Sequence, residues 1–327
     1  MYVLELVGED DGFAVAEAAH AATAVERVAP GLATAESVEI DRLRGLALTR
    51  AAGEVVAQTG ATVEAARAAL ADQAIDRTGS VSVRARDVRG TAGVDTRAAE
   101  RALGDVLTAA GLAVDLETPD HELRALFAAG TAMLTWLAAE SRRDFDERAP
   151  TDKPFFHPGS MDPLEARAVA NLAGAGPGQL ILDPVCGTGG LLIEAGLVGA
   201  SVLGLDAQLE MVRGARVNFE RYLEDWRLSL GDTTRLPVGQ GVDAVVADLP
   251  YGRQSVVAHG DLETLIAGML EEARRVAPRA VVVVDRDCTA AARTAGWSVA
   301  AVHERPVHRS LTRHVHVLTA AASSGSD

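Results

Sequence analysis

The chain has 327 residues, 48% of them apolar, which is enough to fill the cores of two or three domains. No apolar run approaches the roughly 20 residues that a membrane-spanning helix needs, and residues 1–6 lack the features of a secretory signal. The two cysteines, Cys186 and Cys288, cannot form a disulfide framework and lack the spacing of metal ligands. We therefore expect a cytoplasmic protein with no membrane span.

The charge is strongly acidic, with a net value of −15, and Lys153 is the single lysine among 31 basic residues. This composition predicts a host with a salty cytoplasm and a GC-rich genome. An acidic total argues only weakly against a nucleic-acid partner. High salt weakens the counterion release that normally drives phosphate binding, whereas arginines gathered at a contact site still bind phosphate in a planar, bidentate way.

Residues 1–60 are predicted to form a small α+β (ferredoxin-like) unit without a catalytic constellation. Alternating apolar residues predict a strand over residues 2–7, and a short strand is expected at 37–40. Alanine-rich or helically spaced stretches predict helices over residues 13–27 and 43–52.

Residues 61–140 carry the pattern helix, strand, helix, strand, with Gly111 as the expected end of the second helix. The string VDLETPD over 114–120, after a helix that contains ERALG, resembles a THUMP domain, an RNA-binding module of several RNA-modifying enzymes. Residues 121–140 have helical spacing, but the resemblance and the central Gly130 favour a hairpin. Arg84, Arg86 and Arg89 are candidates for RNA contact, and a solvated strand face is the alternative for each.

Residues 141–160 are predicted to be a linker, because they mix charges with helix-breaking prolines. Beyond it, strands and helices alternate, with apolar strands expected over 180–183, 201–206, 228–230, 244–248, 280–285, 298–303 and 314–319. This alternation predicts an α/β, Rossmann-like domain over residues 161–327, with a mostly parallel seven-stranded sheet that ends in an antiparallel hairpin.

Four carboxylates fall at or just after the predicted strand ends: Asp183, Asp206, Asp232 and Asp248. Ligands of such sheets bind at the carboxyl ends of the strands, where the topology switches. The run DPVCGTGG over residues 183–190 follows the first strand, and its glycines let the backbone approach a ligand. The sequence therefore predicts a nucleotide-like ligand at this edge.

Asp183 favours S-adenosylmethionine over a dinucleotide, because an acid directly before the glycines would repel a pyrophosphate but suit a positive amino group and a sulfonium. Asp206 would bind the ribose diol. Asp232 would accept from the adenine amine, with a turn-capping aspartate as the alternative. The predicted cofactor-binding residues are Asp183, Cys186, Gly187, Thr188, Gly189, Asp206 and Asp232.

The segment Asp248-Leu249-Pro250-Tyr251 is the predicted catalytic motif. The carboxylate of Asp248 and the carbonyl of Leu249 would accept hydrogen bonds from an exocyclic ring amine, whose lone pair could then point at a methyl donor. Pro250 stiffens the turn. Tyr251 offers a face on which a flipped base stacks. A strand end with an incidental turn is the structural alternative.

This segment resembles the (Asp/Asn)-Pro-Pro-(Tyr/Phe) motif of amino-methyltransferases, with Leu249 in place of the first proline. With KPFFHPGSM, DPVCGTGG, MVRGAR, LPYGR and HRSLTR in this order, the chain resembles the archaeal tRNA (guanine(10)-N2)-dimethyltransferases. The resemblance implies a class I methyltransferase that uses S-adenosylmethionine to methylate N2 of guanosine 10 in tRNA, first once and then twice. It also implies that the THUMP region holds the tRNA.

The C-terminal stretch is rich in histidine, but no cysteine or acid of suitable spacing completes a metal site, and we expect none. Arg309 and Arg313 are predicted to contact RNA, with an ion network at a strand edge as the alternative. Two competing functions stay open, namely methylation of another base in RNA or DNA (guanine N2 of rRNA or adenine N6) and RNA binding without catalysis. The oligomeric state also stays open.

Overall fold

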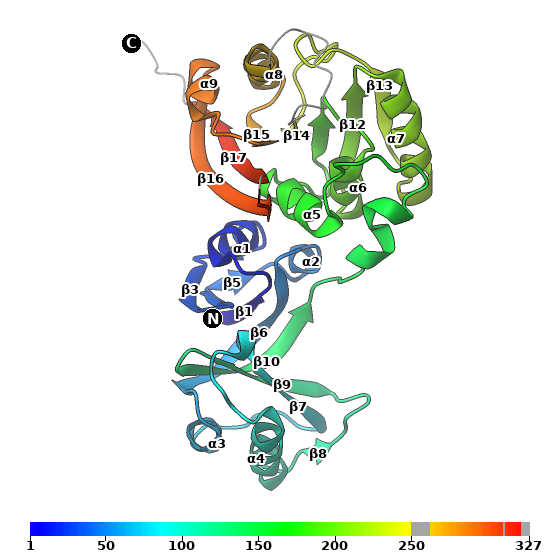
Figure 1. The fold of residues 1–327 in the computed structure, drawn as a ribbon. Helices are drawn as coiled ribbons and strands as arrows, with labels where there is room; N and C mark the ends of the chain where they lie inside the picture. Colours follow the sequence, from blue (N-terminus) through cyan, green and yellow to red (C-terminus); the bar gives the residue numbers. More distant parts are fainter. Residues whose placement is uncertain (250–261, 310, 322–327) are drawn as a thin grey trace. The chain divides into compact units, whose positions relative to one another are not determined.

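The computed structural model describes residues 1–249, 262–309 and 311–321. It divides into two compact units, residues 1–143 and 144–327 (Figure 1). In the described part of the chain, every helix is too short or too polar to cross a bilayer.

The first unit is built on an eight-stranded sheet with the order β3-β4-β1-β6-β10-β9-β7-β8. Its strands are β1 (Tyr2–Leu6), β3 (Glu26–Ala29), β4 (Leu32–Ala35), β6 (Thr49–Gly60), β7 (Ser80–Asp87), β8 (Ala113–Val114), β9 (His121–Ala128) and β10 (Thr131–Glu140). A separate pair joins β2 (Ala22–Thr23) to β5 (Ser37–Val38). The helical segments are α1 (Asp11–Ala18), α2 (Ile40–Leu43), α3 (Val63–Ala71), α4 (Thr96–Ala109) and the 3-10 turn η1 (Val88–Gly90).

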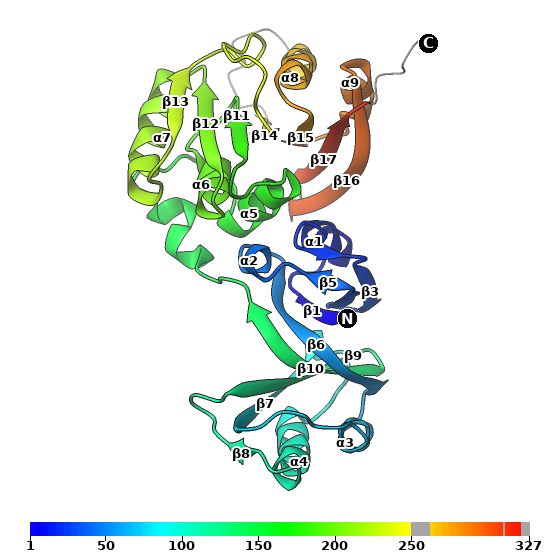
Figure 2. The same cartoon turned by 180° about the vertical axis from the view of Figure 1, so that it is seen from behind.

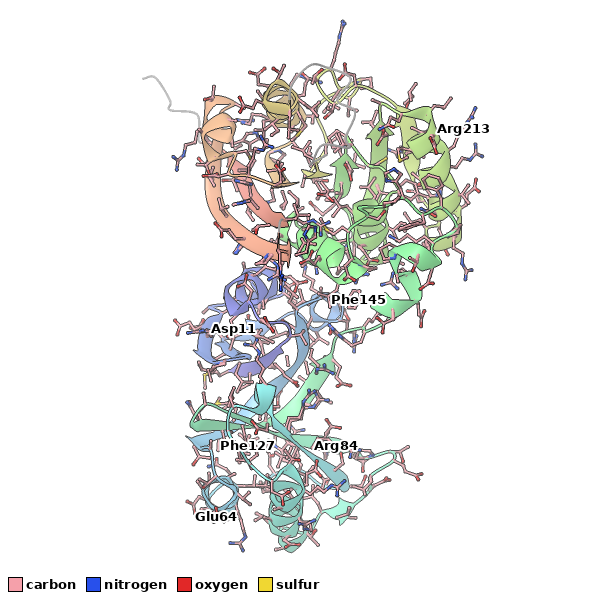
Figure 3. The ribbon with its side chains drawn as sticks, viewed as in Figure 1. Asp11, Glu64, Arg84, Phe127, Phe145 and Arg213 are labelled. Atoms are coloured by element: carbon pink, nitrogen blue, oxygen red, sulfur yellow. The ribbon has the colours of Figure 1, made fainter. Side chains whose placement is uncertain are left out.

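Helices α3 and α4 pack on the sheet through one apolar core that includes Leu70, Leu103 and Phe127, the last of which is labelled in Figure 3 (the helices are also visible in Figure 2). Strands from both predicted N-terminal modules share the sheet, since β6 pairs with β1 and with β10. The division at residue 60 therefore stays a prediction.

The hairpin expected over residues 121–140 is confirmed as β9 and β10, which pair antiparallel around Gly130. Two helix predictions in the first module were wrong. The helix expected over 13–27 ends at Ala18, and strands β2 and β3 follow. The helix expected over 43–52 is absent, because α2 already ends at Leu43 and residues from Thr49 onward pair as β6 with strands on both sides.

The second unit confirms the predicted seven-stranded sheet, with the order β13-β12-β11-β14-β15-β17-β16. Its strands are β11 (Leu180–Asp183), β12 (Ser201–Asp206), β13 (Arg227–Leu230), β14 (Ala244–Asp248), β15 (Arg279–Val284), β16 (Trp297–His308) and β17 (Leu311–Ala320). The first five are parallel, and β17 is antiparallel to both β15 and β16. Its helices are α5 (Pro163–Leu172), α6 (Gly190–Leu197), α7 (Leu209–Tyr222), α8 (Leu262–Val276) and α9 (Thr289–Thr294).

Alternate residues of the central strands face opposite sides of the sheet, as strand geometry requires. Leu182 and Val245 pack with α8 and α9 in one core. Helices α5, α6 and α7 make further contacts with strands of the same sheet. Residues 144–160, predicted as a linker, include the 3-10 turns η2 (Phe145–Arg148) and η3 (Pro150–Asp152) and belong to this unit.

Candidate active site

The candidate site lies at the carboxyl ends of β11 and β14, which are adjacent and parallel. The chain leaves β11 toward β12 on one side of the sheet, while β14 continues toward β15 on the other, so this is the point at which the strand order reverses. Open α/β sheets bind ligands at such a point. Asp183 ends β11 and Asp248 ends β14, which brings two predicted site carboxylates to neighbouring strand ends.

Asp183 is 2% exposed, and its Oδ1 accepts the Val185 amide at 3.0 Å. Burial raises the pKa of Asp183 well above its usual value. The amide of Val185 opposes this rise, whereas the charges of Asp206 and Asp248 add to it. A buried carboxylate among other acids is stabilised by a cation, so this position fits a ligand group of positive charge.

The glycine turn after Asp183 needs glycine for two reasons. Gly187 and Gly189 have φ values of +52° and +83°, in the left-handed region that favours glycine. A Cβ on Gly189 would also overlap the ring of Phe219 from α7. Gly189 in turn donates its amide to the Cys186 carbonyl at 2.7 Å. A side chain at Gly189 would therefore both strain the turn and displace α7.

Cys186 and Thr188 serve the turn itself. Burial raises the pKa of the Cys186 thiol well above its usual value, which keeps it protonated, and nearby Asp183 and Asp206 add to the effect. The Thr188 hydroxyl lies 3.2 Å from the Ser160 hydroxyl, and the Thr188 carbonyl accepts from Asn218 at 2.8 Å. Both residues lie within the predicted site, where these contacts position the backbone.

Asp206 lies at the end of β12 and ties the glycine turn to the next strand. Its Oδ2 accepts the Gly187 amide and its Oδ1 accepts the Gln208 amide, both at 2.9 Å. The Gly231 amide donates to the Asp206 carbonyl at 3.0 Å, which holds Asp232 at the same rim. Asp232 also caps its own turn, because its Oδ1 accepts the Thr234 amide and hydroxyl, each at 2.8 Å. Turn capping, the alternative for Asp232, is therefore present.

Asp248 carries an acceptor that is shut off from solvent. Its Oδ1 has no hydrogen-bond partner among the residues that the structure describes. Burial raises the pKa of Asp248 to about 7, with Arg313 opposing the rise and Glu165 adding to it. The next residue, Leu249, donates its amide to the Val283 carbonyl at 2.9 Å and buries its side chain in the core. Pro250 and Tyr251 lie outside the described residues.

The leucine that departs from the amino-methyltransferase motif has a structural consequence. Proline has no amide hydrogen, so it could not make the bond from residue 249 to Val283. That bond extends the β14–β15 pairing by one residue beyond Asp248. Leu249, directly after the predicted catalytic aspartate, is thus anchored by the sheet at the position where a proline ring would restrict the backbone.

Arg313 does not lie on an exposed basic surface. It is 6% exposed, and its Nη1 lies 3.1 Å from Glu165 Oε2. Arg305 reaches the same carboxylate at 3.4 Å. This placement favours a role beside Asp248 over the predicted contact with RNA. No sequence signal marked Glu165, because its partners come from β16 and β17, more than a hundred residues away along the chain.

The other predicted RNA-binding arginines are exposed. Arg309 lies at the end of the described part of the β16–β17 hairpin. Arg84, labelled in Figure 3, donates to the Leu116 carbonyl at 3.3 Å. Arg86 pairs with Glu5 at 3.0 Å. Each guanidinium has donors left over, since arginine carries five N–H groups.

The first unit also contains an open cavity of about 230 Å³ that sequence reasoning missed. The Arg77 guanidinium lies 5.0 Å from the centre of the Trp136 ring, and the His121 ring packs edge-on against that ring at 6.1 Å. All three residues line the cavity. Within the described residues, by contrast, no group of three or more His, Cys, Asp or Glu side chains is arranged to hold a metal ion.

The strand order, the glycine turn and the rim of carboxylates define a class I methyltransferase fold. A family model described as "UPF0020: RMKL-like, methyltransferase domain" matches residues 150–315. TrmN from Thermus thermophilus has the same fold, with a TM-score of 0.52 over 98% of this chain and 99% of its own, at 24% identity.

Two relatives narrow this class. The tRNA (guanine(10)-N2)-dimethyltransferase of Methanothermobacter thermautotrophicus is 37% identical over 249 residues, which cover 73% of each chain. The protein of the same name from Pyrococcus abyssi is 33% identical over 232 residues, 68% of each chain. The chain belongs to the tRNA (guanine(10)-N2)-dimethyltransferase family.

Proposed function

We propose that this protein uses S-adenosylmethionine to methylate the N2 amine of guanosine 10 in tRNA, to N2-methylguanosine and then N2,N2-dimethylguanosine. The observation that carries the proposal is the Oδ1 of Asp248 at the end of β14, beside the strand that leads into the glycine turn; it has no hydrogen-bond partner among the described residues. Family membership supports the substrate, because the two relatives carry that activity in their names. We further propose that the protein acts in the cytoplasm.

The residues around the glycine turn fit S-adenosylmethionine. The buried Asp183 suits its positive amino group, and Asp206 and Asp232 at the next two strand ends suit the ribose diol and the adenine amine. Gly187 has open space at the position of a Cβ, which leaves its backbone accessible to a ligand, whereas Gly189 lets the turn pack against Phe219. When bound, S-adenosylmethionine supplies an electrophilic methyl carbon.

Asp248 and the Leu249 carbonyl would activate the amine. The N2 lone pair of guanine is delocalised into the ring, which makes the amine a poor nucleophile. Two acceptors aimed at its N–H groups draw the nitrogen toward tetrahedral geometry, so that the lone pair leaves the ring plane. Because the pKa of Asp248 is about 7, the carboxylate can also take at Oδ1 the proton that the nitrogen loses. Tyr251 is proposed as the stacking face for the base.

The first unit is proposed to bind tRNA through its THUMP-like part. Aromatic rings and arginines together form sequence-tolerant stacking sites for unpaired nucleotides. The cavity with Arg77, His121 and Trp136 has this composition, and Arg84 and Arg86 lie on β7, the strand that pairs with β9. We expect Arg77→Ala to weaken tRNA binding in a filter-binding assay while leaving cofactor affinity unchanged. An unchanged tRNA affinity would exclude this cavity as part of the interface.

The direct test is methyl transfer to tRNA transcripts in vitro, followed by mass spectrometry of the nucleosides. A transcript with guanosine at position 10 should gain one and then two methyl groups, whereas a transcript with adenosine there should gain none. Asp248→Ala should abolish transfer but leave S-adenosylmethionine affinity nearly unchanged. Equal loss of both would reject the division of roles between the glycine turn and Asp248.

The second candidate is methylation of another amine, such as guanine N2 in rRNA or adenine N6. The same acceptors would serve any exocyclic amine, so the distinction depends on which RNA is bound. Nucleoside analysis of tRNA from a strain that lacks the gene separates the two. Intact dimethylguanosine at position 10 in that strain would exclude the proposed substrate.

A further inference from the structure

Lys153 is buried beside the first residue of the helix that follows the glycine turn. It is 6% exposed, and its Nζ lies 3.4 Å from the point that a Cβ on Gly190 would occupy. Within the part of the chain that the structure describes, it forms no hydrogen bond or ion pair. Burial lowers the pKa of its ammonium, an effect that the charge of Glu194 partly offsets. A buried ammonium without a partner indicates a place for an anion.

The backbone at the same position offers donors. Helix α6 begins at Gly190, and its first bond to the turn runs from the Ile193 amide to the Gly189 carbonyl at 2.9 Å. The amides of Gly190, Leu191 and Leu192 therefore come before the first amide that donates within the helix, and they have no partner inside it. These amides and the helix dipole favour negative charge at this end.

The buried acid near Lys153 is already paired with two arginines. Glu194, 1% exposed, accepts from Arg148 at 2.8 Å through Oε1 and from Arg167 at 2.7 Å through Oε2, so both of its oxygens are already bonded. The ring of Phe145, labelled in Figure 3, lies within 5.7 Å of both guanidinium groups. Both guanidinium groups are buried, and Arg148 also pairs with the half-exposed Asp144 at 3.1 Å, so Glu194 has no oxygen left for the Lys153 ammonium.

The identity of the residue also matters. Lys153 is the single lysine in a chain that otherwise uses arginine for every basic position. An ammonium is a compact point charge, whereas a guanidinium is planar and larger. Next to Gly190 and the glycine turn, a compact cation leaves room for a small anionic group. The low exposure of Lys153 also favours a small ligand over the backbone of an RNA.

We propose that Lys153, together with the first amides of α6, binds the carboxylate of the methionyl part of S-adenosylmethionine. The inference rests on the proposed function, which supplies the ligand. It also completes the proposed charge pattern of the site, in which Asp183, directly before the turn, would bind the amino group. Lys153 is thus a cofactor-binding residue that discriminates the intact methionyl group from analogues without the carboxylate.

Calorimetric titration of the full-length protein with two ligands tests this. The ligands are S-adenosylmethionine and decarboxylated S-adenosylmethionine, which lacks only the carboxylate. Lys153→Met should weaken binding of the first by about tenfold or more, as expected for loss of a charge-assisted contact, and change binding of the second less than twofold. Lys153→Arg should retain part of the discrimination. Arg213→Met, which removes an exposed positive charge from α7, is the matched control and should bind both ligands like the wild type.

Each outcome bears on the proposal. Equal weakening of both ligands by Lys153→Met, or no weakening of either, would overturn it. So would loss of tRNA binding with both small ligands unaffected, which would assign Lys153 to the RNA instead. If Lys153→Met does not fold, the wild type and Lys153→Arg decide. A wild type that binds the two ligands equally tightly would overturn the proposal. A wild type that binds S-adenosylmethionine more tightly, with part of this preference lost in Lys153→Arg, would support it. A wild type that binds neither ligand would reject the proposed function itself.

Discussion

The pKa of Asp248 determines how methyl transfer should depend on pH. With a value of about 7, only about 10% of this carboxyl group is ionised at pH 6 and about 90% at pH 8. Because the proposed mechanism needs the carboxylate as an acceptor, the rate constant should rise about tenfold per pH unit below 7 and level off above it. In an ordinary aspartate, with a pKa near 3.8, the same range would show a plateau.

Two neighbours should move this midpoint in opposite directions. The positive charge of Arg313 lowers the pKa of Asp248, and the negative charge of Glu165 raises it. Arg313→Gln should therefore shift the midpoint of the profile upward, by about one pH unit for a nearby opposite charge, and Glu165→Gln should shift it downward. Asp248→Asn cannot ionise, so any residual transfer should not depend on pH in this range.

Single-turnover transfer of a labelled methyl group to tRNA, at saturating enzyme and cofactor between pH 5.5 and 9, measures these midpoints. Saturation matters because it separates the chemical step from ligand binding. Buffers of constant ionic strength are needed, since screening would change the effect of Arg313 and Glu165. A profile that stays flat through pH 7, or shifts of the same sign in the two variants, would refute the assignment of Asp248 as the ionising acceptor.

Three further predictions concern stability and the turn. A raised pKa means that the native state favours the protonated form of Asp248. The stability that this proton provides is complete below pH 4 and is lost as the pH rises through 7. In urea unfolding, Asp248→Asn should therefore raise the free energy of unfolding by up to about 4 kcal/mol at pH 8 and by little at pH 4. Leu249→Pro removes the bond to Val283 and should cost about 1 kcal/mol in the same assay. Gly189→Ala places a Cβ against Phe219 at a φ of +83° and should abolish S-adenosylhomocysteine binding in calorimetry; unchanged binding would show that the turn tolerates displacement.

Much of the second unit could be predicted from sequence because its strands are short apolar runs that stop at acids or glycines. The sheet order then follows from the right-handed crossover rule and from the usual position of an antiparallel end. The first unit was harder to predict. Residues 43–52 have helical spacing, yet from Thr49 onward they pair with strands on both sides, and such long-range pairing overrides local preference.

Some residues of the candidate site could likewise be predicted from the sequence, and others could not. Asp183, Asp206 and Asp248 could be predicted because strand ends in a parallel sheet meet at one edge. The contacts of Lys153, Glu165 and Arg313 could not, because they arise where distant segments pack together, and charge alone does not indicate whether a side chain is buried. Lys153 carried one unused signal, since a single lysine in a chain so rich in arginine suggests a position that requires an ammonium.

The site keeps charged groups in buried positions, which lowers the stability of the ligand-free protein. Asp183 is a buried acid and Asp248 an acid with a buried Oδ1, and the pKa of each is raised, whereas Lys153 is a buried base whose pKa is lowered. Each therefore destabilises the ligand-free protein in its charged form. A ligand with a positive and a negative group at matching positions relieves part of this cost, so binding should stabilise the fold by more than its neutral contacts alone provide. It follows that the thermal stabilisation by S-adenosylmethionine should exceed that by decarboxylated S-adenosylmethionine at equal concentration, and that Lys153→Met should reduce the difference to what the amides of α6 alone provide.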